Sequence, residues 1–309
     1  MTVFLSKRNN QFKMSLTTAT PSKSVTLSLL SSNDATIYWG DGSFELISQN
    51  TESYAMVHIY ATANTYNVVI DKPHRMLKFS IVTDYNIIIE AGEIGKLKNL
   101  ETLILQRQDE VHMASGEIRN LKNLKNLDID RPTTSLTSYD VNIENGDLTF
   151  LPDLESIYLE GIENVSISAT DWDSLLNLSS IILINLPNLL VSGGSLENTS
   201  NLAIMYFQNI GSLELTELDF SGKEDLTEIA IYNCSLTEQQ IDDILGYVYN
   251  NRMSYIHPDY IDLNDIGYFD PPEKYNSYPS AAGLAIWDIL QNDPLDEGFN
   301  VWGGWVNEA

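Results

Sequence analysis

A short apolar pattern recurs along the middle of the chain at an almost constant spacing. Seven copies can be aligned on a central apolar residue, which lies at Met76, Leu100, Leu124, Leu154, Leu178, Leu202 and Leu226. The steps between these positions are 24, 24, 30, 24, 24 and 24 residues. Chance does not preserve such a register, so the chain contains an internal repeat, and repeats of this length stack on one another.

Each copy predicts a short strand. The fullest copies read L-x-x-L-x-x-(L/I)-x-(L/I), as in Leu97 to Leu105, and the final alternation turns two apolar side chains inward. The residues ahead of it, such as 95–100, predict a returning turn or a short helical piece. One copy cannot bury its apolar face alone, whereas stacked copies share one core. The longer step predicts an extra loop between Arg131 and Asp147.

The period and the L-x-x-L-x-L core resemble the leucine-rich repeat over about residues 73–247. This resemblance implies an α/β repeat solenoid of seven copies. The family usually places Asn or Cys three residues after the last strand leucine, where this chain has Leu186, Ile210 and Cys234. Asparagines lie one residue earlier, at 185, 209 and 233. We therefore expect a different loop geometry and a buried, unreactive Cys234.

Residues 1–72 have another pattern. Short alternating runs separated by turn residues predict a small all-β immunoglobulin-like sandwich ahead of the repeats. The sequence from Trp39 to Ser43 reads W-G-D-G-S, and it is followed by His58-Ile59-Tyr60 and by Tyr66-Asn67-Val68. These motifs resemble the PKD (polycystic-kidney-disease) type of domain, in which they serve folding. The resemblance implies that Trp39 and Tyr66 belong to the core and that His58 is structural.

Residues 248–309 are predicted to be a C-terminal capping segment. A helix with Thr237 as its N-cap precedes this segment. The segment itself is predicted to contain a strand near residue 260, a helix from residue 279 and a strand near residue 301. This order resembles the end of leucine-rich-repeat proteins from Bacteroidetes-type bacteria and their phages. The predicted domains are therefore 1–72, 73–247 and 248–309.

The charge is strongly acidic, with 43 Asp and Glu against 17 Lys and Arg and a net charge of −26. Such a field repels DNA and RNA, so nucleic acid is not an expected partner. A single cysteine excludes an intramolecular disulfide. We find no apolar run long enough for a signal peptide or a membrane span, and we expect neither.

The sequence lacks the common catalytic motifs for nucleotide binding, metalloproteases and serine hydrolases. The four histidines are isolated from one another. We therefore predict no enzyme activity, no cofactor and no metal. Two alternatives stay open, which are a glycosidase-like pair of acids and calcium ligation by 171–173 or by 262–265.

The residues between the inward strand leucines should line one open face. Aromatic, aliphatic and acidic side chains gather there, which suits contact with a protein or a carbohydrate. The alternative is that cap or insertion residues cover them. The predicted binding residues are Ile104, Asp128, Asp130, Tyr158, Glu160, Ile182, Ile184, Tyr206 and Tyr232.

We interpret the chain as a non-enzymatic binding or structural protein. The leading hypothesis is a phage virion component, such as a tail or fibre appendage, that recognises a host surface or another virion protein. A bacterial cell-surface adhesin is the first alternative, and a carbohydrate-active enzyme is the second. Extended modules of this kind often act as one copy of a homo-oligomer.

Overall fold

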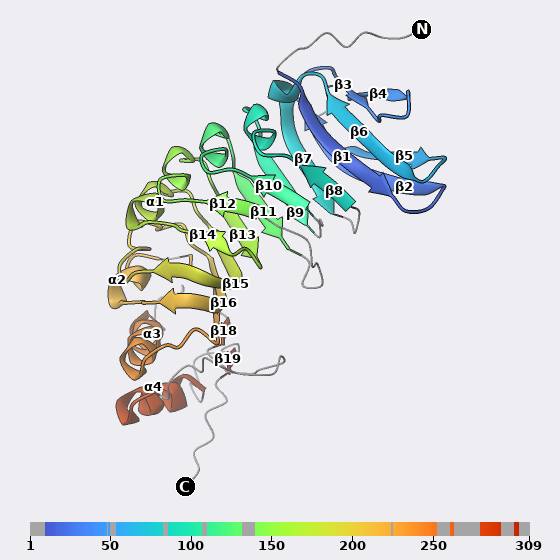
Figure 1. The fold of residues 1–309 in the computed structure, drawn as a ribbon. Coiled ribbons are helices and arrows are strands. Elements are labelled where there is room, and N and C mark those ends of the chain that lie inside the picture. Colours follow the sequence, from blue (N-terminus) through green and yellow to red (C-terminus); the bar gives the residue numbers. More distant parts are fainter. Residues whose placement is uncertain are drawn as a thin grey trace. The chain divides into compact units, whose positions relative to one another are not determined.

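The computed structural model describes residues 10–47, 49, 54–82, 86–106, 110–131, 140–223, 225–251, 260–262, 279–291 and 300–302. The described residues are mostly β, arranged in two large mixed sheets with few helices (Figure 1). The predicted fold class, an α/β repeat solenoid preceded by a small sandwich, is therefore wrong. The chain divides into two compact units, residues 1–143 and 144–309.

The first unit consists of strands and 3-10 turns. Its elements are β1 (Phe12–Thr18), β2 (Lys23–Ser31), β3 (Ala35–Tyr38), β4 (Phe44–Ile47), β5 (Tyr54–Tyr60), β6 (Asn64–Ile70), η1 (Pro73–Arg75), β7 (Met76–Val82), β8 (Asn86–Ile89), η2 (Ile94–Lys96), β9 (Thr102–Gln106), β10 (Glu110–Met113), η3 (Ile118–Asn120), β11 (Asn126–Asp130) and β12 (Asp140–Ile143). One sheet has the order β5-β2-β7-β9-β11, and the other has the order β4-β3-β6-β1-β8-β10-β12.

The N-terminal strands belong to the same two sheets as the first repeats. Strand β2 pairs antiparallel with the repeat strand β7, and β1 pairs antiparallel with β8. The rings of Phe12 on β1 and Phe79 on β7 meet edge to face, with centroids 4.9 Å apart, so the core is continuous. Glu93 of the first repeat accepts a hydrogen bond from the backbone N–H of Lys13 (2.6 Å). A first repeat would otherwise expose core and open strand edges, and β1 and β2 cover both.

The returning segments explain why the described residues of the first unit contain no α-helix, although the predicted turn or short helical piece is present as a 3-10 turn. Buried residues alternate along β8 and β10, with Ile87 and Ile89 on β8 and Val111 and Met113 on β10. This period of two is that of a strand, and a helix would need apolar residues three or four apart. Each returning segment then ends in one 3-10 turn. These turns are η2 and η3 in the first unit and η4 (Leu148–Phe150) at the start of the second.

The six extra residues of the long repeat lie in a narrower segment than predicted. Strand β10 begins four residues after the end of β9, whereas β12 begins ten residues after the end of β11. The insertion therefore falls within 131–139, of which residues 132–139 lie outside the described part of the chain. Residues 140–143 form β12 rather than the predicted loop, because they pair in parallel with β10.

The second unit has a parallel sheet and most of the helices. After η4 its elements are β13 (Ser156–Glu160), β14 (Asn164–Val165), α1 (Ala169–Ser174), β15 (Ser180–Val191), β16 (Ile204–Leu213), α2 (Glu217–Phe220), β17 (Glu228–Tyr232), α3 (Glu238–Asn251), β18 (Tyr260–Asp262), α4 (Ala281–Gln291) and β19 (Asn300–Trp302). Its sheet has the order β13-β15-β16-β17-β18-β19. Paired residues from β13 to β17 are 24 positions apart, as the sequence period requires, except at the ends of β15 and β16. There the register shifts, and Leu190 pairs with Ser212 and Val191 with Leu213.

The displaced asparagines form a ladder that accounts for the departure from the family pattern. Asn185, Asn209 and Asn233 have φ values of 54°, 53° and 54°, in the left-handed region that asparagine tolerates better than most residues. The side-chain amide of Asn209 donates to the amide oxygen of Asn185 (2.6 Å), and that of Asn233 donates to the amide oxygen of Asn209 (2.7 Å). Gly161 takes the equivalent place in the preceding repeat, with a φ of 67°. Cys234 follows the ladder and is buried, as predicted.

The predicted start of the C-terminal helix is confirmed. The backbone N–H and the hydroxyl of Thr237 both donate to the side chain of Gln240 (2.8 Å each), and the Gln240 N–H returns a bond to Thr237. Helix α3 buries Ile241, Ile244 and Leu245. Strands β18 and β19 then extend the parallel sheet beyond β17. None of the described helices is both long and apolar enough to cross a membrane.

Candidate functional site: a strand face of tyrosine, isoleucine and glutamate

Six of the nine predicted binding residues lie together on one face of the parallel sheet in the second unit. One row pairs Tyr158, Ile182 and Tyr206 across β13, β15 and β16. The next row runs from Glu160 through Ile184 and Gln208 to Tyr232 on β17. All six are half-buried and alternate with fully buried residues. We call this group the tyrosine face, and its members are Tyr158, Glu160, Ile182, Ile184, Tyr206 and Tyr232.

The other three predicted residues lie in the first unit. Ile104 on β9 pairs with Asp128 on β11, and Asp130 pairs with Gln106. The Gln106 amide donates to the Asp128 carboxylate (2.7 Å). These side chains are also half-buried, and they share one face of their own sheet. Their part in binding stays a prediction.

Hydrogen bonds within single strands orient the tyrosine rings. The Tyr158 hydroxyl donates to the Glu160 carboxylate (2.5 Å), and the Tyr206 hydroxyl donates to the Gln208 side-chain oxygen (3.0 Å). The rings of Tyr206 and Tyr232 lie 5.4 Å apart at 55°. A ring held at its hydroxyl loses little freedom on binding a partner and still offers an apolar surface.

The four strands of the face contribute negative charge and no positive charge. Strands β13, β15, β16 and β17 contain Glu160 and Glu228 but no lysine or arginine. The surrounding sequence has the same bias, because residues 144–309 hold 28 of the 43 acidic residues and 3 of the 17 basic ones. A neutral or cationic partner is therefore favoured over an anionic one.

A column of acidic residues that the sequence analysis missed holds the returning loops in both units. Glu117, Asp171 and Asp219 each accept a hydrogen bond from the backbone of the residue three positions earlier and from a glycine 25 positions earlier. All three are buried. They follow the repeat register, four residues before its first apolar position. That regular spacing was the signal from which the column could have been found.

Asp171 shows how complete this capping is. Its carboxylate accepts bonds from the backbone N–H groups of Gly146 (2.9 Å), Leu148 (3.1 Å), Thr149 (3.0 Å) and Ser168 (2.9 Å). Burial alone raises the pKa of Asp171, but these bonds outweigh it and hold the pKa below its usual value. The bonds occupy the oxygens that a calcium ion would need, so residues 171–173 are a loop cap.

The second calcium alternative cannot be placed in the same way. Residues 263–265 of the segment 262–265 lie outside the described part of the chain. Across the residues that are described, no three His, Cys, Asp or Glu side chains are grouped as a metal site would require.

Lys223 is a buried cation that interrupts the repeat pattern. It takes the place of the first leucine of its copy, and only 2% of it is exposed. Its ammonium group donates to the Leu196 carbonyl (2.6 Å). Burial lowers the pKa of Lys223 to about 8, although Asp219 and Glu197 act in the opposite direction. The sequence analysis did not anticipate a lysine at a core position.

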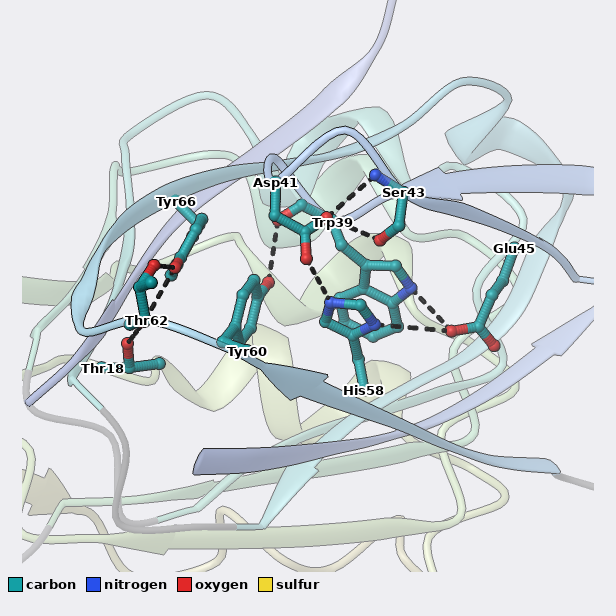
Figure 2. A network of polar contacts seen from close by, with 9 residues as sticks. All are labelled: Thr18, Trp39, Asp41, Ser43, Glu45, His58, Tyr60, Thr62 and Tyr66. Carbon is teal, nitrogen blue, oxygen red and sulfur yellow. Dashed lines mark hydrogen bonds and ion pairs between the residues drawn. The ribbon is translucent and has the colours of Figure 1, made fainter. Parts of the chain in front are cut away.

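The PKD-like motif forms a packed network in the first unit (Figure 2). Trp39 is fully buried, and its indole N–H donates to Glu45 (2.9 Å). The His58 ring stacks on Trp39, with centroids 4.6 Å apart at 7°, and its Nε2 lies 2.8 Å from the Asp41 carboxylate. The Tyr60 hydroxyl donates to the Trp39 carbonyl (2.8 Å). These contacts confirm that Trp39 is a core residue and that His58 is structural.

The rest of the network holds the tight turn and the neighbouring strand. Ser43 donates to Asp41 through its backbone N–H (2.9 Å) and its hydroxyl (2.6 Å). Partial burial raises the pKa of Asp41, but the bonds from Ser43 and His58 more than reverse this and lower the pKa. Tyr66 is buried, as predicted, and its hydroxyl donates to the Thr62 carbonyl (2.8 Å).

Comparison with known proteins identifies no relative that would assign a function to these sites. No model of a known protein family matches the chain, and no curated protein matches it either. The resemblances to the leucine-rich repeat and to the PKD type of domain therefore rest on the residues quoted above and stay predictions.

Proposed function

We propose that the protein is a non-enzymatic binding protein and that the tyrosine face is its contact surface. The observation that carries this proposal is the in-register grouping of Tyr158, Ile182, Tyr206 and Tyr232 on one half-exposed side of four parallel strands. A sheet face that meets only water is normally polar, and a continuous apolar group on a surface marks a contact site.

The chemistry of the face supports a protein or carbohydrate partner. Oriented tyrosines are the anchors that protein contacts use most often, and their rings also stack on sugars. The two glutamates, on four strands that contain no lysine or arginine, favour a neutral or basic partner over a sulfated or phosphorylated one.

We further propose that the protein belongs to a phage particle, where it contacts a host surface or another virion protein. This part rests on the sequence resemblance of the C-terminal segment. Antibodies against the chain should detect it in purified particles. Detection on bacterial cells and never in particles would instead support the cell-surface adhesin.

The direct test compares binding of two double variants to intact bacterial cells. Tyr158→Ala/Tyr206→Ala removes two anchors, and we expect a loss of at least tenfold, since each buried tyrosine anchor is worth about 1–2 kcal/mol. Leu176→Ala/Leu190→Ala removes two exposed leucines outside the face and should bind as the parent does. Equal binding by both variants, each still folded, would rule out the tyrosine face as the contact surface.

A further inference from the structure

Among the described residues, one sheet of the first unit ends in strand β5, whose outer edge is not paired with another described strand. Among the described residues, β5 pairs with β2 and with no other strand (Figure 1). Its side chains alternate, with Met56 and Tyr60 buried, whereas Val57 and Ile59 are 54% and 61% exposed. An open row of backbone groups therefore runs beside a row of exposed apolar side chains.

This edge lacks the features that usually protect a terminal strand. Natural edges are blunted by charged residues, by proline, by bulges or by shortness. Strand β5 has seven residues, YAMVHIY, with no Lys, Arg, Asp, Glu or Pro. Its histidine, His58, is turned inward onto Trp39 and Asp41. The edge is therefore competent to pair with a further strand.

The other sheet of this unit ends differently. Its terminal strand β4 has four residues, FELI, and includes Glu45. Phe44 and Leu46 are exposed there, but a four-residue strand offers few backbone pairs. We therefore regard β5 as the stronger edge for association.

The distribution of charge permits a second copy of this chain to be the partner at this edge. Residues 1–143 hold 15 acidic and 14 basic residues, whereas residues 144–309 hold 28 and 3. Two copies of such a polyanion repel each other through their second units, and only the first unit is close to neutral. The uncharged β5 lies in that unit, so two copies can meet there without opposing like charges.

The pattern of β5 is also complementary to itself. In an antiparallel pair of two β5 strands centred on Val57, Val57 of one copy faces Val57 of the other, and each Ala55 faces an Ile59. Cross-strand apolar pairs of this kind stabilise a sheet. A two-fold interface uses one patch twice, and this is the commonest symmetry of soluble oligomers.

We propose that two copies of the protein associate through β5, in antiparallel register about Val57, to form one sheet that continues across a two-fold axis. This inference does not depend on the proposed function of the tyrosine face. Its consequence for any binding is that each dimer carries two contact surfaces, which raises avidity without a new contact.

The first test is the mass of the full chain in solution, measured by sedimentation at micromolar concentration. We expect twice the mass of one chain. Val57→Lys/Ile59→Lys places four like charges at the axis and should give the single-chain mass. Leu176→Lys/Leu190→Lys makes the same change at exposed leucines of the second unit and should stay dimeric. A single-chain mass for the parent, or a dimer of the Val57→Lys/Ile59→Lys variant, would overturn the proposal.

The second test fixes the register. The natural Cys234 is buried, so an introduced surface cysteine is the accessible thiol among the described residues. Val57→Cys should be cross-linked between copies by a mild oxidant, because directly opposed strand residues lie within disulfide range. Leu190→Cys, equally exposed, should not cross-link. Equal cross-linking of the two variants would show random collision and would contradict pairing through β5.

Discussion

The two units have the same 24-residue period. They differ in the elements that cover the end of each stack of repeats and in how charge is distributed. In the first unit, antiparallel strands β1 and β2 cover the first repeat, and acidic and basic residues are nearly balanced. In the second, helix α3 and strands β18 and β19 follow the last repeat, and acids outnumber bases 28 to 3. The repeat thus sets the register, whereas the ends and the surface are free to diverge.

The acidic column is the feature that the units share most closely, and removing it should have the largest effect. Asp171→Ala leaves four buried or part-buried N–H groups without their acceptor, so we expect a loss of about 3–5 kcal/mol in the free energy of unfolding. Urea unfolding of Asp171→Ala and of Glu117→Ala tests whether both units depend on the column.

The pH dependence of the parent provides a check on this prediction. A carboxyl group whose pKa is lowered in the folded state contributes stability above its unfolded pKa, and that stability is lost as the pH falls through the folded value. The parent should therefore lose stability below about pH 4 more steeply than Asp171→Ala. If Asp171→Ala lowers the free energy of unfolding by less than about 1 kcal/mol at neutral pH, water replaces the carboxylate as the acceptor.

Lys223 distinguishes the second unit from the first and should have the next largest effect. Its pKa is about 8 in the fold, against 10.5 when exposed, so the unfolded chain binds more protons between these values. Stability should then rise with pH in that range, by at most about 3 kcal/mol. Lys223→Met should remove this rise.

Chemical denaturation between about pH 7 and about pH 9 measures this effect, because an unperturbed tyrosine has a pKa of about 10 and stays mostly protonated over that range. Lys122→Met is the matched control, because that lysine is exposed in the first unit. If the stability of the Lys223→Met variant rises with pH by the same amount as that of the parent, the rise does not come from Lys223.

The asparagine ladder lies in the second unit, and its removal should have the smallest of the three effects. Asn209→Ala removes both ladder bonds and places alanine at a positive φ, so we expect a loss of about 1–3 kcal/mol. Asn209→Gly relieves the backbone strain while still losing the bonds. Thermal unfolding should place the glycine variant between the parent and the alanine variant. Equal stability of all three would mean that the ladder contributes nothing measurable.

Much of the site could be predicted because a strand has a fixed period of two. Once the buried leucines are aligned, residues such as Tyr158 and Tyr206 must fall on the opposite face. The loop at the insertion was placed too broadly, because the alternation of Val141 and Ile143 was read as loop composition. Lys223 was missed because its hydrocarbon stem can occupy a leucine position while its ammonium group reaches a carbonyl.

The linear sequence settles the register of the repeats, the buried leucines and the side chains that share a face, because these follow from local spacing. The linear sequence does not settle which residues the first and last repeats contact. Whether the N-terminal strands form a sandwich of their own or join the repeat sheets depends on pairings such as that of β2 with β7, between residues far apart in the chain. Those pairings follow from the need to cover open edges and exposed core, and this need arises only once the strands are assembled.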